Sequence, residues 1–393
     1  MKAIRICYLT TSYPRFDGDE ASIFVERLAE ALSQKGVHLT VVVPKDRTEP
    51  VIEHRLGIEI KRFGYRLFAK EGLAFGAGII PNLKRNPFLI FQAPLLFLGM
   101  LLKSFFVAQK SDFIIANWIF SAAVAFALSI LTGKQYIYIV RGAEINLFKS
   151  KVLRFLFAPV INSASSVVCV SAGFVETISK YYPNQNKCKF IPNGITVYSV
   201  TNDEVNSLAS RKGIDTSKKH LLFVGTLIPR KNIDYLFELL TSKELAEYHL
   251  IVCGRLSDQL YVKHLRDKIL ALNLDSRVKL EGEVSPKEVS AYLEISSAYI
   301  TASKQEGTPN AVLEAISYGK PVFASDIEAH RELLGDFTKE CLFPLDNKEK
   351  AALAIKTLIL DSANLHQIAK NCQEKLKGRN WEAAAEAYLS LCL

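Results

Sequence analysis

The sequence predicts an α/β protein built from two doubly wound domains, each with a mostly parallel sheet. An apolar strand, an amphipathic helix and a second apolar strand open the chain between residues 5 and 43, and the same pattern restarts at Leu221. A chain of 393 residues is long enough for two cores. We expect domains at 1–200 and 201–378, joined by a polar linker at 199–220.

The composition is that of a folded protein from a reducing compartment. Hydrophobic residues make up 49% of the chain and charged residues 23%. The seven cysteines are odd in number, scattered, and without Cys-x-x-Cys spacing, which argues against a disulfide framework or a zinc site. The first residues enter a strand without the apolar core of a signal peptide. We therefore expect a cytoplasmic protein.

The net positive charge lies entirely in the first half of the chain. Residues 1–200 hold 24 Lys and Arg against 13 Asp and Glu, whereas residues 201–393 hold 25 against 27. Such a basic half attracts nucleic acid, anionic lipid or phosphorylated substrates. Because no recognised nucleic-acid motif accompanies it, we expect no nucleic-acid partner and favour a membrane surface or a lipid phosphate. A solvated basic face without a partner is the alternative.

The most apolar run spans residues 88–108 and follows a basic stretch that begins at Lys61. Gln92, Pro94 and Lys103 interrupt it and leave about ten residues between breaks, too few to span a bilayer. Residues 61–108 fit an amphipathic element at a membrane surface, peripheral at the inner face of the cytoplasmic membrane. They fit equally a buried core helix beside a solvated basic loop.

The elements of the first half follow one another as strand, loop and helix. After the first strand, the loop at residues 13–22 lies where doubly wound sheets bind ligands, and it contains Gly18 and Asp19. Ser22 can cap the next helix and Gly36 can end it. Strands at 112–118 and 136–140 flank a further helix, and the second of these strands ends in Arg141-Gly-Ala-Glu144.

In the second half, the strand at 221–224 ends in Gly225 and is followed by the adjacent cations Arg230 and Lys231. Two cations between the end of a strand and the start of a helix suit a diphosphate, although solvated charges at a helix start are the alternative. Another strand exits through Gly282 to Val284.

The stretch Lys304–Pro321 predicts a loop followed by a capped helix. Thr308 is a good N-cap, Pro309 fits the first helical position, and Gly319 and Pro321 end the helix. The N-terminus of such a helix offers unpaired N–H groups to a phosphate. Glu306 lies just before this helix and Glu314 lies within it, so we expect the two carboxylates to have different roles.

These motifs together resemble those of glycosyltransferase family 4, retaining enzymes of the GT-B fold. Glu306-x7-Glu314 within EGTPNAVLEAISYGKPV resembles the family signature, and GTLIPRKN resembles Gly-x-Leu-x-x-x-Lys-Gly with Asn232 in place of glycine. Arg141-Gly-Ala-Glu144 resembles His-Gly-x-Asp, with arginine where histidine is common. The resemblance is strong over 221–325 and weak over 45–110.

The resemblance implies two Rossmann-like domains that face a central cleft, with a closing helix at 379–393 that returns to the first domain. It implies that Glu306, Arg230, Lys231 and Arg141 are catalytic, and a structural ion pair is the alternative role of Arg141. It also implies a donor site for a nucleoside-diphosphate sugar in the second domain, made of Gly225, Gly282, Val284, Gly307, Thr308, Pro309, Asn310 and Glu314. Gly18, Asp19 and Glu144 would face the acceptor in the first domain.

No metal or cofactor is expected. Asp17-Gly18-Asp19 spells the Asp-x-Asp string that binds metal in the other large glycosyltransferase fold, but its place in a first loop favours a loop and helix-start role. The resemblance thus predicts transfer of a hexose-type sugar to a saccharide or lipid-linked saccharide, in bacterial surface polysaccharide biosynthesis. The alternatives are a nucleotide-sugar-binding scaffold with impaired catalysis and a sugar-nucleotide epimerase of the same fold.

Overall fold

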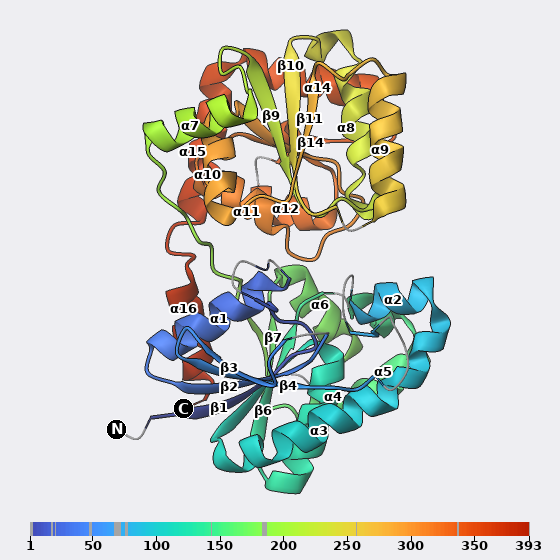
Figure 1. Ribbon diagram of the computed structural model, residues 1–393, viewed down its shortest axis with the longest axis vertical. Helices are drawn as coiled ribbons and strands as arrows, with labels where there is room; N and C mark the ends of the chain where they lie inside the picture. The colour runs from blue at the N-terminus through green and yellow to red at the C-terminus, as the bar shows by residue number, and fades with distance from the viewer. Residues whose placement is uncertain are drawn as a thin grey trace. The chain divides into compact units, whose positions relative to one another are not determined.

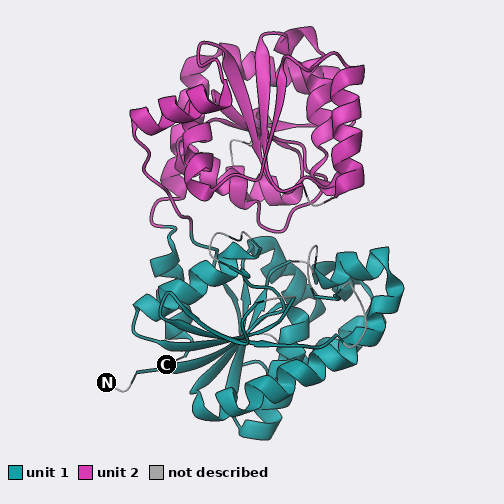
Figure 2. Ribbon diagram, viewed as in Figure 1, with its two compact units in different colours: residues 1–194, 379–393 teal, residues 195–378 magenta. Residues whose placement is uncertain are grey.

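The computed structural model describes residues 3–16, 19, 21–46, 49–66, 72–74, 78–142, 144–182, 187–256, 258–335 and 338–392. The chain divides into two compact units, coloured separately in Figure 2. Unit 1 comprises residues 1–194 and 379–393, and unit 2 comprises residues 195–378. The division thus falls a few residues before the boundary predicted at residue 200.

Unit 1 is built on an eight-stranded sheet in the order β3-β4-β2-β1-β5-β6-β7-β8 (Figure 1). Only the edge strand β3 runs antiparallel, against β4. The strands are β1 Arg5–Leu9, β2 His38–Pro44, β3 Ile52–Arg55, β4 Ile58–Phe63, β5 Phe113–Asn117, β6 Gln135–Val140, β7 Ser166–Cys169 and β8 Cys188–Phe190. The α-helices are α1 Ile23–Gln34, α2 Ile79–Arg85, α3 Ala93–Lys110, α4 Trp118–Thr132, α5 Lys151–Ser163, α6 Ala172–Tyr181 and α16 Trp381–Ser390, with 3₁₀ helices η1 Pro87–Gln92 and η2 Ile145–Lys149.

Each face of this sheet is covered by a different layer of helices (Figure 1). One core is shared by the sheet with α3, α4 and α5, which contribute Leu96, Ala125 and Ile161 among others. The other core is shared with α1 and α16, which contribute Leu28 and Tyr388 among others. Since strands that are covered on both faces read as continuous apolar runs, this explains the unbroken hydrophobic strands of the sequence.

Helix α3 corrects one expectation. The sequence suggested a run broken at Pro94 and Lys103, but α3 continues without a break through both. Pro94 lies in the first turn, where a missing N–H removes no helical hydrogen bond. Among the described residues, Pro87–Lys110 is the one stretch long and apolar enough to cross a membrane, with 22% of its most apolar window buried. Its inner side packs against α4 and the sheet.

The C-terminal segment packs onto unit 1. Lys35 at the end of α1 forms ion pairs with Glu382 and Glu386 of α16, with Nζ–Oε1 distances of 2.6 and 2.7 Å. The Nε atom of Arg379 donates to the carbonyl of Asn193 at 2.9 Å. A Cβ atom at Gly194 would lie 2.3 Å from the backbone N of Trp381. The close backbone approach therefore requires glycine at this position.

Unit 2 is a six-stranded parallel sheet in the order β11-β10-β9-β12-β13-β14. Its strands are β9 Lys219–Val224, β10 Tyr248–Cys253, β11 Val278–Gly282, β12 Ala298–Thr301, β13 Val322–Ser325 and β14 Leu342–Phe343. Its α-helices are α7 Asn202–Lys212, α8 Ile233–Leu240, α9 Gln259–Ala271, α10 Pro286–Ile295, α11 Asn310–Ser317, α12 Glu328–Leu334, α13 Thr338–Cys341, α14 Lys348–Leu360 and α15 Ser362–Lys375, with 3₁₀ helices η3 Pro229–Lys231 and η4 Lys243–Leu245. Two doubly wound parallel sheets confirm the predicted fold class.

The predicted linker at 199–220 is wrong over half of its length, because α7 occupies residues 202–212. Thr201 and Glu204 form a capping box, and Gly213 ends the helix in the left-handed conformation. The apolar Leu208 and Ala209 are buried, and α7 packs against α10. A helix with so few apolar residues resembles a linker in composition, whereas its capping residues identify it.

Candidate active site

The predicted cations and carboxylate meet at the switch point of the unit 2 sheet. Strands β9 and β12 are neighbours, with Leu221 opposite Ala298, yet they belong to opposite halves of the sheet order. Loops that leave such a pair diverge, and ligands of doubly wound sheets bind between them. The loop after β9 carries Arg230 and Lys231, and the loop after β12 carries Glu306.

Glu306 lies at the centre of this cluster. Its Oε1 atom accepts hydrogen bonds from Lys231 Nζ at 2.6 Å and from Ser303 Oγ at 2.7 Å. Its Oε2 atom accepts from Arg230 Nη1 at 3.1 Å. The side chain of Glu306 is only 7% exposed, while that of Arg230 is 44% exposed. The arrangement therefore holds one carboxylate inside and presents at least one cation outward.

Charge determines the protonation state of Glu306. Burial alone would raise the pKa of this carboxyl, but the neighbouring Lys231 and Arg230 lower it, as do hydrogen bonds from Lys231 and Ser303. The net result is a pKa below the ordinary value of glutamate. Glu306 is therefore ionised at neutral pH and is an acceptor of hydrogen bonds rather than a general acid.

Three residues that were not predicted as site residues support Glu306 through a chain of polar contacts. Ser325 Oγ donates to the carbonyl of Ser303 at 2.6 Å, and Ser303 in turn donates to Glu306. The fully buried His330 contacts the Ser325 carbonyl through Nδ1 at 2.8 Å. Burial lowers the pKa of His330, so it is neutral at neutral pH. Ser303 lies in the same loop as Glu306, whereas Ser325 and His330 come from β13 and α12, and no local sequence signal connects these two with Glu306.

Glycines allow the strand ends beside the cluster to approach closely. Gly225 N donates to the Cys253 carbonyl at 2.9 Å, and Gly254 N donates to the Gly282 carbonyl at 2.6 Å. A Cβ atom at Gly254 would lie 1.8 Å from the carbonyl oxygen of Gly225. Gly225 and Gly282 were predicted site residues. The structure adds Gly254 as the position at which no side chain fits.

Asn232 explains a departure from the family pattern. It follows the two cations and adopts the left-handed conformation, with φ of 55° and ψ of 42°. Asparagine is one of the few residues besides glycine that adopts this conformation readily. The backbone turn into α8 therefore has a conformation that glycine also adopts readily.

The other predicted donor residues follow the carboxyl ends of β11 and β12 in the chain. Val284 is buried after the end of β11, and Glu314 is half-buried within α11. Gly307, Thr308 and Pro309 form the loop before α11, which begins at Asn310 with Pro309 as its N-cap. The predicted helix start at Thr308 and Pro309 was therefore too early, because Pro309 adopts a ψ of 79°, outside the helical region.

In unit 1, Arg141 follows β6 and is buried. Its Nε and Nη2 atoms donate to Asn117 Oδ1 at 3.0 and 2.9 Å, and Nη1 donates to Asn193 Oδ1 at 2.6 Å. The guanidinium also lies over the ring of Phe24, 5.1 Å from its centroid. Beside Asn117, Trp118 has a positive φ of 63°, which is costly for a bulky residue and typical of functional sites. Sequence reasoning did not identify Asn117, Asn193 or Trp118.

Glu144 folds back onto its own loop. Its carboxylate accepts from Tyr138 Oη at 3.0 Å, from Gly142 N at 3.1 Å and from Arg141 N at 3.4 Å. Burial raises the pKa of Glu144 despite these hydrogen bonds. Its predicted role was to face the acceptor, but the structure places it inside unit 1, where it orders the turn after β6.

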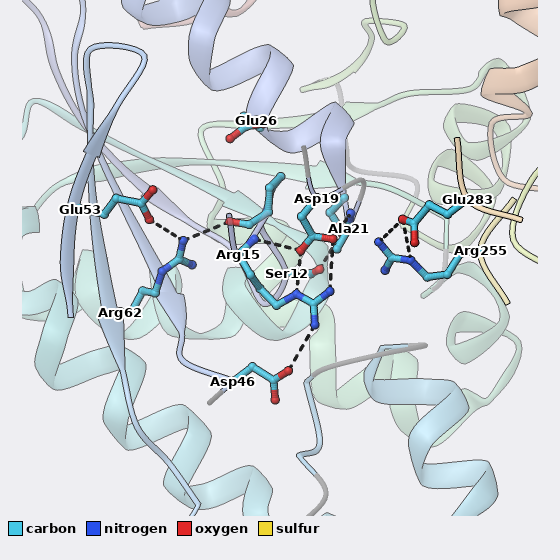
Figure 3. Close-up of polar contacts among 12 residues, drawn as sticks. Ser12, Arg15, Asp19, Ala21, Glu26, Asp46, Glu53, Arg62, Arg255 and Glu283 are labelled. Atoms are coloured by element: carbon cyan, nitrogen blue, oxygen red, sulfur yellow. Dashed lines mark hydrogen bonds and ion pairs between the residues drawn. The ribbon is translucent and has the colours of Figure 1, made fainter. Parts of the chain in front are cut away.

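Asp19 is likewise satisfied within its own loop, as Figure 3 shows. Its carboxylate accepts from Arg15 Nε at 2.7 Å and from Ala21 N at 3.2 Å, and Arg15 also approaches Asp46 at 3.6 Å. Asp19 is 1% exposed, so it shapes the loop rather than lining an open surface. The neighbouring Gly18 and Asp17 lie outside the described residues.

The β3–β4 hairpin fixes the same loop. Arg55 and Arg62 both donate through Nη2 to the Pro14 carbonyl, at 3.0 and 3.1 Å. Arg62 is fully buried and pairs with Glu53 at 2.9 Å (Figure 3). These arginines belong to the region of weakest family resemblance, where sequence reasoning found only basic charge. Among the described residues, no group of three or more His, Cys, Asp or Glu side chains could hold a metal ion.

Comparison with known proteins agrees with this geometry. The model of the glycosyltransferase family 4 matches residues 21–198, and the model of the group 1 glycosyl transferases matches residues 206–375. The Anabaena protein HepE, solved in complex with UDP-glucose, is similar with a TM-score of 0.74 and 17% identity, covering 98% of this chain and 99% of that one.

Two curated relatives are distant in sequence. The alpha-monoglucosyldiacylglycerol synthase of Streptococcus pneumoniae is 23% identical over 244 residues, covering 60% of this chain and 54% of that protein. The chain thus spans about half the length of this relative. TuaC of Bacillus subtilis, named as a teichuronic acid biosynthesis glycosyltransferase, is 21% identical over 358 residues, covering 84% of this chain and 83% of that protein.

The two doubly wound sheets and the likeness to solved structures give the chain the GT-B fold, the fold of a large class of sugar-transferring enzymes. Between them the two family models cover most of the sequence. The chain belongs to the group 1 glycosyltransferases.

Proposed function

We propose that the protein transfers a hexose-type sugar from a nucleoside-diphosphate sugar to a saccharide or lipid-linked saccharide, with retention of anomeric configuration and without a metal ion. The observation that carries this proposal is the ionised, buried Glu306 held between Lys231 and Arg230 at the unit 2 switch point. Relatives named for glycolipid and teichuronic acid synthesis support the class of acceptor, and UDP-glucose in HepE supports the class of donor.

In this proposal the donor diphosphate lies against Arg230 and Lys231. As the bond between the anomeric carbon and the diphosphate breaks, negative charge grows on the leaving oxygen, and the two cations stabilise it. Lysine and arginine thereby supply the charge that a metal supplies in other transferases. Glu306 accepts hydrogen bonds from sugar hydroxyls and fixes the ring, while Glu314 accepts from the ribose hydroxyls.

The acceptor hydroxyl then attacks the anomeric carbon from the face that the diphosphate leaves. The new bond joins the acceptor oxygen to that carbon, and the hydroxyl proton passes to the departing phosphate oxygen. This proton route suits the site because the pKa of Glu306 is too low for an efficient general base near neutrality. Retention follows because both bonds involve the same face of the sugar.

A thermal-shift panel of UDP, GDP, ADP and their common sugars, with and without a chelator, tests the donor part of the proposal. A ligand at a hundred times its Kd stabilises the protein by about 2.7 kcal/mol. We expect one base to stabilise the wild type equally in both conditions, and Arg230→Ala to lose most of that shift. A shift that the chelator removes would contradict the metal-free proposal, and an unchanged shift in Arg230→Ala would contradict the site.

Transfer itself is tested by incubating the donor so identified with candidate saccharide and lipid-linked acceptors. Proton NMR of the product should show the anomeric configuration of the donor. An inverted product would contradict retention, and release of an epimerised sugar nucleotide without any acceptor would replace transfer by epimerisation. We further propose a cytoplasmic location, which agrees with the seven unpaired cysteine thiols.

A further inference from the structure

One helical layer of unit 1 exposes an unusual number of large apolar side chains. The layer consists of η1, α3, α4 and α5, because α4 packs against both α3 and α5 and all three α-helices share one core with the sheet (Figure 1). A large exposed apolar patch on a soluble unit marks an interaction surface. We call the outward side of η1, α3 and α5 the α3–α5 face.

The first part of this face lies along η1 and α3. Phe88 and Phe91 of η1 are 78% and 76% exposed, and Phe106 near the end of α3 is 68% exposed. Leu95, Leu98 and Leu102 are also exposed and continue the row at intervals of three and four residues. Residues at this spacing share one side of a helix. The row therefore faces away from the core that Leu96 and Met100 enter.

The second part lies on the first two turns of α5. Phe155 is 86% exposed, the highest value among the large hydrophobic residues that the structure describes, and Val152 and Leu156 beside it are exposed as well. The opposite side of α5 enters the core through Val160 and Ile161. α5 therefore has an apolar outer side as well as an apolar inner side. A surface helix that faces only solvent normally has a polar outer side.

The charged side chains in these elements are all basic. The sequence contains no Asp or Glu between residues 78 and 111 or between residues 145 and 163. Lys84, Lys149 and Lys151 are exposed next to the apolar rows. By contrast, α9 and α14 of unit 2 carry acidic and basic residues together.

We propose that the α3–α5 face docks on a membrane with an anionic surface, with the phenylalanines in the interface and the lysines against lipid phosphates. Apolar side chains framed by lysine and arginine are the pattern of interfacial binding. A symmetric contact with a second copy would place one cationic face against another, which is unfavourable. The inner side of α3 is packed in the core, so α3 lies on the bilayer and does not cross it.

This inference rests on the proposed function in one respect, since a surface-bound enzyme reaches a lipid-linked acceptor directly.

Sedimentation of the full chain with vesicles tests docking without any catalysis. We expect binding to vesicles of phosphatidylglycerol and phosphatidylcholine, weaker binding at high salt, and little binding to pure phosphatidylcholine. Equal binding to both kinds of vesicle, or none to either, would overturn the proposal.

Two triple variants locate the surface. Phe91→Ser/Phe106→Ser/Phe155→Ser and Lys84→Gln/Lys149→Gln/Lys151→Gln should each weaken binding to the anionic vesicles by at least about tenfold. The matched control is Leu260→Ser/Leu353→Ser/Leu360→Ser, which alters equally exposed leucines of unit 2 and should bind as the wild type does. A control that weakens binding as much, or a wild-type dimer that the phenylalanine variant converts to monomer, would overturn the assignment.

The nucleotide thermal shift separates the two proposals. All three variants should keep the full shift with the donor nucleotide, because their substitutions lie outside the Glu306 cluster. A normal nucleotide shift without vesicle binding would refute the docking surface alone. Vesicle binding without any nucleotide shift would refute the donor site alone.

Discussion

The two units have the same kind of sheet and place charged residues at the same kind of position, but they use the charges differently. At the switch point of unit 2, Glu306 accepts hydrogen bonds from two cations and a serine, and Arg230 remains substantially exposed. At the strand ends of unit 1, Arg141 and Glu144 are buried and bonded within their own unit. A motif residue at a ligand-binding edge can therefore serve either chemistry or loop architecture, and the exposure of its bonding partners distinguishes the two.

The largest expected effect is on transfer in Glu306→Gln. The amide has the same shape but removes the charge that orients Lys231, Arg230 and the sugar, so we expect kcat/KM to fall by about 10²–10³. Glu294→Gln, which alters an exposed carboxylate paired with Lys320 in the same unit, is the control and should retain activity. Comparable activity of Glu306→Gln and the wild type would remove Glu306 from the site.

The same comparison predicts that Glu144→Gln affects folding more than chemistry. A glutamine cannot accept all the hydrogen bonds from Tyr138, Gly142 and Arg141 with the same geometry, so we expect a loss of about 1–3 kcal/mol in the free energy of unfolding. Its thermal shift with the donor nucleotide should equal that of the wild type. Loss of transfer at unchanged stability would return Glu144 to the acceptor site.

Gly254→Ala tests the close approach of the strand ends in unit 2. The new Cβ would collide with the Gly225 carbonyl, and we expect a loss of about 1–3 kcal/mol in stability together with weaker nucleotide binding. Gly213→Ala has the same sign of φ but open space around it, so it should lose only about 1 kcal/mol and bind nucleotide normally. Urea unfolding and the thermal shift measure both quantities.

The contributions of the two buried carboxyls, Glu306 and Glu144, to folding stability should also change with pH in opposite directions. The folded-state pKa of Glu306 is lowered, so its stabilising contribution is present above the unfolded-state pKa and is lost as pH falls through the folded-state value. The folded-state pKa of Glu144 is raised, so its contribution is present at low pH and is lost as pH rises through the folded-state value.

Unfolding free energies from pH 3 to 8 measure this difference. The advantage of the wild type over Glu306→Gln should grow with pH in the acid range, while its advantage over Glu144→Gln should shrink as pH rises above the ordinary glutamate pKa. The slope for a single group cannot exceed about 1.4 kcal/mol per pH unit. Slopes of the same sign for the two variants would contradict the electrostatic contrast between the units.

Sequence alone predicted the fold class, because strand and helix periodicity is a local signal that defines each sheet. It also placed Arg230, Lys231 and Glu306 after their strands, but a shared site for them was implied by the family resemblance, and the pairing of β9 with β12 is seen only in the structure. It could not find contacts made across strands, such as the support of Glu306 by Ser325 and His330. It also missed α7, whose signal lies in its capping residues rather than in apolar periodicity.

Sequence reasoning was weakest where side-chain direction decides the role. Arg141 carries the right chemistry for a site, but its partners come from separate segments, and only the folded chain shows that Asn117 and Asn193 accept hydrogen bonds from its guanidinium. The exposed side of α5 was missed for the same reason, since Phe155 and Ile161 look alike in a sequence. For unit 1, the sequence predicted an excess of basic residues but did not predict the exposed apolar α3–α5 face beside them.

The most direct test of the central claim is the Kd of the nucleoside diphosphate for Lys231→Met, measured by calorimetry in the presence of a chelator. The control is Lys212→Met, which removes a lysine paired with Glu281 at 2.9 Å in the same unit. Loss of one charged contact to the diphosphate should weaken binding of Lys231→Met at least about tenfold, or 1.4 kcal/mol, and leave Lys212→Met unchanged. Wild-type affinity in Lys231→Met, or equal weakening in both variants, would contradict a donor site built on the cations of unit 2.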